Sequence, residues 1–315
     1  MVSTTSSINP TKIEIFLTFL TLGLSSFGGP IAHLGFFNKE LVIKRRWLDS
    51  QLFSELVALC QFLPGPSSSQ VGLSIGFIKG GFSGALAAWI GFTTPSAIIL
   101  ILFGYGYAVY SDVIPFGAIH GLKIFAVAIV AQAICTMGLT FCKDVKCIII
   151  TIAVGIFIVL APTPLFQFSA IILSGVIGAF VFNISETKEE SKFQYLIKIR
   201  LALTLLLSFF ILLFLLPILV NVLDNPVLSV IDSFYRAGSL VFGGGHVVLP
   251  LLQTEIVSAG YVSNEAFLAG YGAAQAMPGP LFTFAAYLGT VSGSYPNGLF
   301  GGLLALFAIY LPSFS

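Results

Sequence analysis

The chain has few charged residues: only 9% of its 315 residues are Asp, Glu, Lys or Arg, and the formal net charge is +1. A nucleic-acid partner would be indicated by a strongly basic composition, and this nearly neutral chain gives no such indication. Most of the remainder is hydrophobic, at 57% of all residues, with a mean hydropathy of +1.01. A soluble domain does not tolerate so much apolar surface. The composition predicts an all-α, polytopic integral membrane protein.

Cysteine is scarce as well, and no pair of the four cysteines has the CxxC spacing of a zinc or redox site. We therefore expect buried, reduced thiols. The signatures HExxH and GxSxG are missing, and no paired carboxylates stand on an apolar segment. These absences predict a protein that is not an enzyme and that uses no metal and no cofactor.

A cleavable leader is also missing from the pattern. The first dozen residues are polar, and no small-residue cleavage site follows the first apolar run, so we expect that run to insert and remain. Ten apolar segments are predicted, at about 14–37, 54–78, 82–110, 117–141, 147–161, 165–182, 200–223, 229–252, 264–292 and 296–315.

Two of these segments contain the same helix-breaking tripeptide, Pro64-Gly65-Pro66 and Pro278-Gly279-Pro280. A proline inside a helix removes a hydrogen bond and clashes with the preceding turn. In lipid, the freed backbone groups need a partner from the protein or from a water-filled cavity. Helices broken at matching positions are typical of transporters built from internal repeats, with the substrate site at the breaks.

The spacing of other landmarks predicts a duplication. Phe27 precedes Pro66 by 39 positions and Phe242 precedes Pro280 by 38. Gly84 precedes Pro95-Ser96 by 11 positions, and Gly301 precedes Pro312-Ser313 by 11. We predict a first repeat with its linker at residues 1–195 and a second repeat at residues 196–315.

The placement of charge predicts that the two repeats have opposite orientation. The first repeat carries Lys39, Lys44, Arg45 and Arg46 between its landmarks, whereas the matching loop 253–264 carries no Lys or Arg. Basic loops stay in the cytoplasm. The first loop falls inside if segments 14–37 and 54–78 are re-entrant or strongly broken, which we prefer over two full crossings. The expected location is the cytoplasmic membrane, with many passes.

The second repeat is shorter than the first, because the chain stops two residues after Ser313. A truncated protein and a protein completed by a second polypeptide, or by a homo-oligomer, are both open interpretations.

The candidate substrate site lies at the two breaks and at two glycine clusters. A helix that restarts after Pro-Gly-Pro offers unpaired N–H groups and a positive dipole end, which bind anions. The alternative is that the prolines only kink a packed helix and the glycines only allow close packing. Matching glutamines precede both breaks, and a histidine that could titrate near neutral pH follows the second cluster. The candidate residues are Gln61, Pro64, Gly65, Pro66, Ser67, Ser68, Ser69, Gln275, Pro278, Gly279, Pro280, Thr283, Gly28, Gly29, Gly244, Gly245 and His246.

Arg236, on an apolar segment, has two interpretations. It could serve a substrate pathway, or it could pair with Asp232 four residues earlier, which we favour.

Four stretches together resemble the chromate ion transporter family: Ser26-Phe27-Gly28-Gly29-Pro30, residues 59–66, residues 242–250 and residues 277–283. The resemblance implies transport of chromate across the cytoplasmic membrane, chiefly as efflux that confers resistance, by two homologous halves of opposite orientation. It also implies a second half as long as the first, from which this chain departs. Sulfate or another oxyanion as the substrate, and a remnant that depends on a partner, stay open as alternatives.

Overall fold

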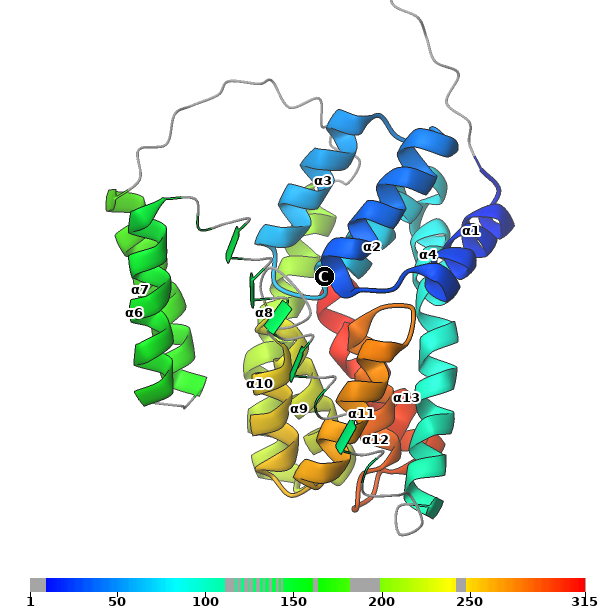
Figure 1. Cartoon of the computed structure of the whole chain (residues 1–315). Helices are drawn as coiled ribbons and strands as arrows, with labels where there is room; N and C mark the ends of the chain where they lie inside the picture. The colour runs from blue at the N-terminus through cyan, green and yellow to red at the C-terminus, as the bar shows by residue number, and fades with distance from the viewer. Residues whose placement is uncertain are drawn as a thin grey trace, which may run out of the picture. The chain divides into compact units, whose positions relative to one another are not determined.

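The computed structural model describes residues 10–110, 144–160, 164–181, 199–241 and 248–314, with scattered positions between 117 and 142. Over these residues the protein is helical and contains no strand (Figure 1). The chain divides into two compact units, residues 127–191 and the remainder. The expected all-helical fold is therefore confirmed for the described residues.

The smaller unit contains a pair of packed apolar helices, α6 (Val145–Leu160) and α7 (Pro164–Val181). No residue of α6 is buried within the protein. The four cysteines are free, but only Cys60, in the larger unit, is buried; Cys135 is exposed and Cys142 and Cys147 are intermediate. The expectation of buried thiols was wrong for these three because the smaller unit covers few of its own side chains.

The larger unit begins with a series of short helices and ends with a similar series. The first series is α1 (Lys12–Ser25), α2 (Gly29–Phe37), the π-helix η1 (Asn38–Lys44), α3 (Ser50–Phe62) and α4 (Ser67–Tyr110). After α8 (Ile199–Leu223), the second is α9 (Pro226–Ser239), α10 (Val248–Leu252), the π-helix η3 (Gln253–Val257), α11 (Asn264–Ala276), the 3-10 turn η4 (Leu281–Thr283), α12 (Phe284–Thr290), α13 (Gly298–Tyr310) and η5 (Leu311–Phe314). We call residues 10–110 the first half and residues 226–314 the second half.

Helix bounds in the two halves agree closely. Helices α1 and α9 both have 14 residues, and α9 begins 214 positions after α1. Helices α3 and α11 both have 13 residues and are offset by the same 214 positions. Each of the four helices begins at a side chain that accepts a hydrogen bond from the first turn, namely Thr11, Asp49, Asn225 and Ser263.

Several predicted segments are more broken than the apolar pattern indicated. The segment 14–37 is two helices, because Gly28 and Gly29 have φ of +96° and +78°, which a helix cannot continue. Helix α4 reverses at Gly80 and Gly81, where the backbone leaves helical values, and this position agrees with the predicted boundary between segments 54–78 and 82–110. At this reversal Gly76 and Gly84 face each other so closely that a Cβ on either would overlap the other's carbonyl group.

The lengths of these helices matter for a membrane protein. Two described helices, α4 and α8, are long and apolar enough to cross a membrane. In contrast, a helix of 13 or 14 residues, such as α1 or α3, is only about 20 Å long, whereas a bilayer core is about 30 Å thick. The short helices therefore cannot each cross alone.

Candidate functional site

The first break joins α3 to α4. Helix α3 ends at Phe62, Gly65 adopts φ of +122°, and α4 begins at Ser67. The Gln70 side-chain amide donates to the Pro64 carbonyl over 2.8 Å and holds the turn closed. The four residues that open α4, Ser67, Ser68, Ser69 and Gln70, are all buried. The break therefore places three hydroxyls and a helix N-terminus inside the protein.

The second break joins α11 to η4 and α12 with nearly the same backbone. Gly279 has φ of +102°, and the chain restarts as the 3-10 turn η4. The Thr283 hydroxyl donates to the Pro280 carbonyl over 2.7 Å, and Thr283 is buried. The helix that follows, α12, has only 7 residues, so its dipole is weaker than that of α4.

Each break is hydrogen-bonded to the opposite half. The Gly65 N–H donates to the Val241 carbonyl over 2.7 Å, and the Gly279 N–H donates to the Ser26 carbonyl over 2.9 Å. Ser26 and Val241 occupy the same place in their halves, two positions before the first glycine of a cluster. The two hydrogen bonds thus form a reciprocal pair.

The second landmark pair takes part in the same arrangement. A Cβ built on Gly279 would lie 2.7 Å from the Ser96 Oγ, and one built on Gly65 would lie 3.7 Å from the Ser313 Oγ. Ser96 belongs to the first half and Ser313 to the second, so each break also approaches a serine of the opposite half. The sequence predicted both breaks and identified both serines as matching landmarks. It did not predict that each break lies next to the serine of the opposite half.

Several buried polar atoms on the segments that form or meet the two breaks have no hydrogen-bond partner in the structure. They include the Ser69 Oγ and the Gln70 Oε1 on α4, and the Ser26 and Ser313 Oγ atoms on the segments that meet the breaks. A buried hydroxyl or amide without a partner costs about 1–3 kcal/mol. Such atoms around one place are the donors and acceptors that a bound polar ligand would satisfy.

Sequence reasoning missed His33, which lies on α2 and is completely buried. Its Nδ1 lies 3.4 Å from the Ser68 Oγ, while its Nε2 has no partner. The sequence did contain a signal for a functional role of His33, because a histidine inside an apolar segment, here four positions after Gly29, needs a polar partner.

The two matching glutamines lie at the rim of the breaks. Gln61 and Gln275 are both partly buried, one turn before each break. The Gln275 amide donates to the Tyr271 hydroxyl over 2.6 Å. Gly28 and Gly29 lie at the start of α2, whereas the predicted site residues Gly244, Gly245 and His246 lie outside the described residues.

The predicted pairing of Arg236 with Asp232 is confirmed, and a third group joins it. The Arg236 Nη2 lies 2.9 Å from the Asp232 Oδ2 and 2.9 Å from the Glu255 Oε2 on η3. Burial raises the pKa of the Glu255 carboxyl above its usual range. Two carboxylates therefore share one guanidinium, and no sequence pattern around Arg236 indicated Glu255 as a partner.

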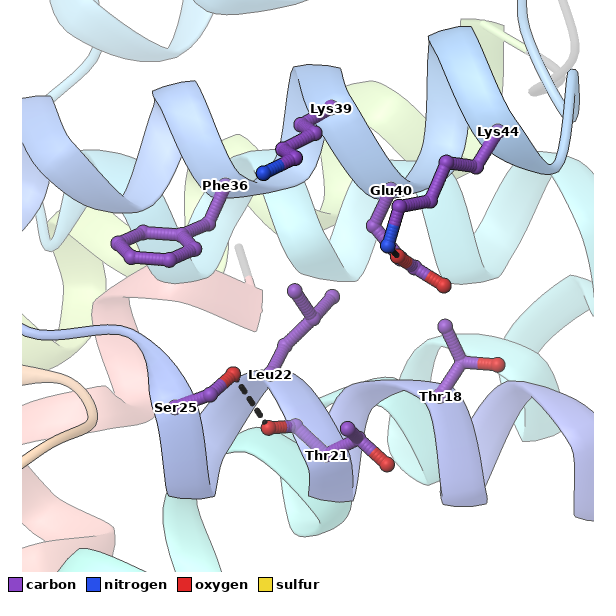
Figure 2. Close-up of a pocket in the computed structure, with 8 residues that line it drawn as sticks. All are labelled: Thr18, Thr21, Leu22, Ser25, Phe36, Lys39, Glu40 and Lys44. Carbon is purple, nitrogen blue, oxygen red and sulfur yellow. Dashed lines mark hydrogen bonds and ion pairs between the residues drawn. The ribbon is translucent and has the colours of Figure 1, made fainter.

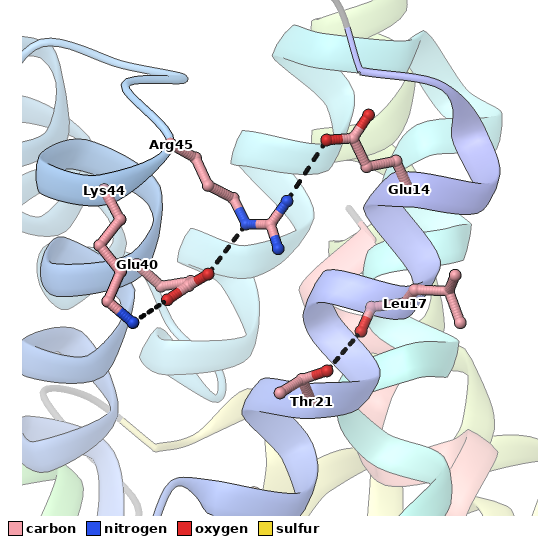
Figure 3. A network of polar contacts seen from close by, with 6 residues as sticks. All are labelled: Glu14, Leu17, Thr21, Glu40, Lys44 and Arg45. Atoms are coloured by element: carbon pink, nitrogen blue, oxygen red, sulfur yellow. Dashed lines mark hydrogen bonds and ion pairs between the residues drawn. The ribbon is translucent and has the colours of Figure 1, made fainter.

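The corresponding π-helix of the first half, η1, holds a more open ion-pair network. The Glu40 carboxylate accepts from Lys44 and from Arg45, each over 2.9 Å, and Arg45 reaches Glu14 of α1 over 3.3 Å (Figure 3). The hydrogen bond from Lys44, followed by the one from Arg45, lowers the pKa of Glu40 below its usual range. Among the described residues, no group of three or more His, Cys, Asp or Glu side chains could hold a metal ion.

Comparison with known proteins gives one consistent family. The family model described as chromate transporter matches residues 13–180 and 228–315, which include both breaks. A chromate transport protein of Pseudomonas aeruginosa is 25% identical over 327 residues, covering 99% of this chain and 74% of the relative. A probable chromate transport protein of Synechococcus elongatus is 27% identical over 307 residues, covering 94% and 72%.

An uncharacterized transporter of Methanocaldococcus jannaschii is 25% identical over 309 residues, covering 97% of this chain and 75% of the relative. No solved structure matches the chain. The family match extends over most of the sequence, and its relatives are membrane transporters rather than enzymes. The chain therefore belongs to the chromate transporter family.

Proposed function

We propose that this protein carries chromate, or a closely related tetrahedral oxyanion, across the cytoplasmic membrane. The names of the Pseudomonas aeruginosa and Synechococcus elongatus relatives state chromate transport for those proteins. The observation that carries the proposal is the reciprocal pair of hydrogen bonds from Gly65 and Gly279. Through it, two broken helices meet the opposite half at a buried polar centre, as a substrate site between repeats requires.

The first break offers the chemistry that a dianionic oxyanion needs. Chromate spreads two negative charges over four oxygens, which accept hydrogen bonds and donate none. Ser67, Ser68 and Ser69 supply hydroxyl donors at the N-terminus of α4, where unpaired N–H groups and the helix dipole favour an anion. We assign the stronger binding to this break, because η4 and α12 offer fewer donors and a shorter helix.

We propose that the chain consists of two inverted repeats, residues 1–195 and 196–315, which contain the first half and the second half respectively. The 214-position offset of two helix pairs, with equal lengths, supports the duplication. Inversion is supported by the basic loop of the first half, which has no counterpart in the second. The short helices favour re-entrant or broken segments over full crossings.

Alternating access follows as the proposed mechanism. Ser67 to Gln70 are buried, so an anion reaches them only when the halves part. Each break forms one backbone hydrogen bond with the opposite half. If one of these two bonds breaks while the other is kept, the substrate site between the halves would open to one side of the membrane. We assign the direction as efflux, which would lower the chromate concentration in the cell.

Uptake by inverted membrane vesicles tests the proposal. Vesicles that contain the full chain should take up radiolabelled chromate in a saturable manner and above vesicles without it. Sulfate is the matched competitor, because it has the same shape and charge. Transport of sulfate without chromate would reassign the substrate, and uptake of neither would contradict the proposed function.

A further inference from the structure

A cavity with charged side chains in its lining lies between α1 and the continuous helix formed by α2 and η1. It encloses about 210 Å³. Figure 2 shows the side chains of α1 facing those of α2 and η1 across it. The lining consists of Thr18, Thr21, Leu22, Ser25, Phe36, Lys39, Glu40 and Lys44.

Positive charge is in excess in this cavity. Both oxygens of the Glu40 carboxylate are already occupied, one by Lys44 and the other by Arg45. Across the described part of the chain, no carboxylate forms an ion pair with Lys39, whose ammonium reaches into the same space (Figure 2). Lys39 is exposed and has no carboxylate partner among the described residues, so its charge is available to an anion.

The cavity also contains a free hydroxyl donor. Thr18 is only 3% exposed, and its Oγ1 has no hydrogen-bond partner. The other two hydroxyls are engaged, because Thr21 donates to the Leu17 carbonyl and Ser25 to the Thr21 carbonyl. A buried hydroxyl without a partner is destabilising unless a ligand or water completes it. Thr18 on α1 and Lys39 on η1 thus both line this cavity, the first with a buried hydroxyl that has no partner and the second with an exposed ammonium that no described carboxylate pairs.

The cavity is connected to the second break by α1. Thr18 precedes Ser26 by eight positions, about 12 Å along a helix, and the Ser26 carbonyl accepts the Gly279 N–H. The lysines belong to the basic loop that the charge pattern places on the cytoplasmic side. An anion in this cavity would therefore lie between the cytoplasm and the buried centre.

From these contacts we propose that the cavity is an entry site, in which Lys39 and Thr18 bind the oxyanion before it reaches the breaks. Lys44 can turn from Glu40 to the anion, because Arg45 keeps the carboxylate paired. This inference rests on the proposed transport of an oxyanion. The phosphate of an anionic lipid has the same chemistry, and we commit to the dissolved oxyanion as the occupant.

Transport kinetics in proteoliposomes of neutral phosphatidylcholine test the entry site. Lys39→Gln should raise the half-saturating chromate concentration about tenfold, the change that corresponds to about 1.4 kcal/mol. Thr18→Val should also raise the half-saturating chromate concentration, and both variants should leave the maximal transport rate nearly unchanged. Arg46→Gln is the matched control, because it removes one charge from the same loop without touching the cavity. An unchanged half-saturation in Lys39→Gln contradicts the inference, as does an effect that needs added anionic lipid.

A binding measurement separates this inference from the transport proposal. In a cysteine-free background, Thr21→Cys places an accessible thiol on the cavity wall. Sulfate should slow its reaction with a thiol reagent, and Lys39→Gln should abolish that protection. If sulfate protects the thiol in a protein that does not transport chromate, the entry site is supported and the proposed transport function is refuted. If the protein transports chromate but sulfate gives no protection, the transport function is supported and the entry site is refuted.

Discussion

The backbone N–H of Gly65 donates to the carbonyl oxygen of Val241 over 2.7 Å, although the two residues belong to opposite halves of the chain. The equivalent bond runs from Gly279 to Ser26. A backbone donor freed by a helix break in lipid must find an acceptor. Here the acceptor comes from the other half, so the two breaks hold the halves together.

Gly65→Ala should destabilise the protein and reduce transport. At φ of +122°, a residue with a Cβ is strained, and the new atom would lie 2.8 Å from the Gln70 amide that closes the turn. We expect a loss of about 2 kcal/mol, measured by thermal unfolding in detergent. Gly35→Ala is the control, because no atom within 4 Å opposes its Cβ. Equal stability of the two variants would contradict the strain argument.

Ser69→Ala should separate binding from folding. The Ser69 Oγ is buried without a partner, so removing it should leave stability unchanged or slightly raised. If this hydroxyl contacts the anion, the half-saturating chromate concentration should rise about tenfold, for the loss of about 1.4 kcal/mol. Unchanged transport kinetics in a stable variant would remove Ser69 from the site. The double variant Ser67→Ala with Gln61→Ala extends the test to the neighbouring candidates.

Cysteine labelling should show opposite orientation of the two halves. Ser50 and Asn264 open α3 and α11, are 214 positions apart, and are both exposed. In a cysteine-free background, an impermeant reagent should label Ser50→Cys from the cytoplasmic side and Asn264→Cys from the outside. Labelling of both from one side would refute the inverted arrangement.

Arg236→Gln should cost more stability than a surface ion pair. It leaves Asp232 and Glu255, with side-chain exposures of 6% and 18%, next to each other without a cation. Breaking a fully buried pair costs about 3–5 kcal/mol, and we expect about 2 kcal/mol here because Arg236 is one-third exposed. Arg45→Gln, in the more exposed network of η1, should cost less than about 1 kcal/mol. Equal costs in thermal unfolding would argue against the triad.

The network around Glu40 should make stability depend on pH. The folded-state pKa of this carboxyl is lowered below its usual value of 4.5. Its ion pairs therefore stabilise the fold above that value, and this contribution is lost as the pH falls through the lowered pKa. The difference in unfolding temperature between the wild type and Glu40→Gln should shrink from pH 6 to pH 3. A difference that is constant over this range would refute the assignment.

Much of the fold could be predicted from local patterns. Pro64-Gly65-Pro66 and Pro278-Gly279-Pro280 predicted two breaks because proline and glycine act through their own backbone. The pair Asp232 and Arg236 was predictable because four positions are one helical turn. The break between α1 and α2 and the chain reversal at Gly80 and Gly81 follow from the same local chemistry, although the apolar pattern alone joined 14–37 into one segment.

Contacts between distant residues could not be predicted in this way. Nothing near Arg236 in the sequence indicates Glu255, and nothing near His33 indicates Ser68. The same holds for Thr18 and Lys39, which line one cavity from two different helices. Such contacts depend on how helices pack, and the apolar surfaces that drive packing specify many partners about equally well.

Composition and local pattern were enough to predict a helical membrane protein, the positions at which its helices break, and the residue types at the breaks. These properties depend on composition and on backbone preferences that act within a few residues. That each break is hydrogen-bonded to the opposite half depends on the packing of the fold, because a freed N–H can donate to any carbonyl oxygen within reach. The packing of the two halves brings Val241 to Gly65 and Ser26 to Gly279, and so creates the shared polar centre.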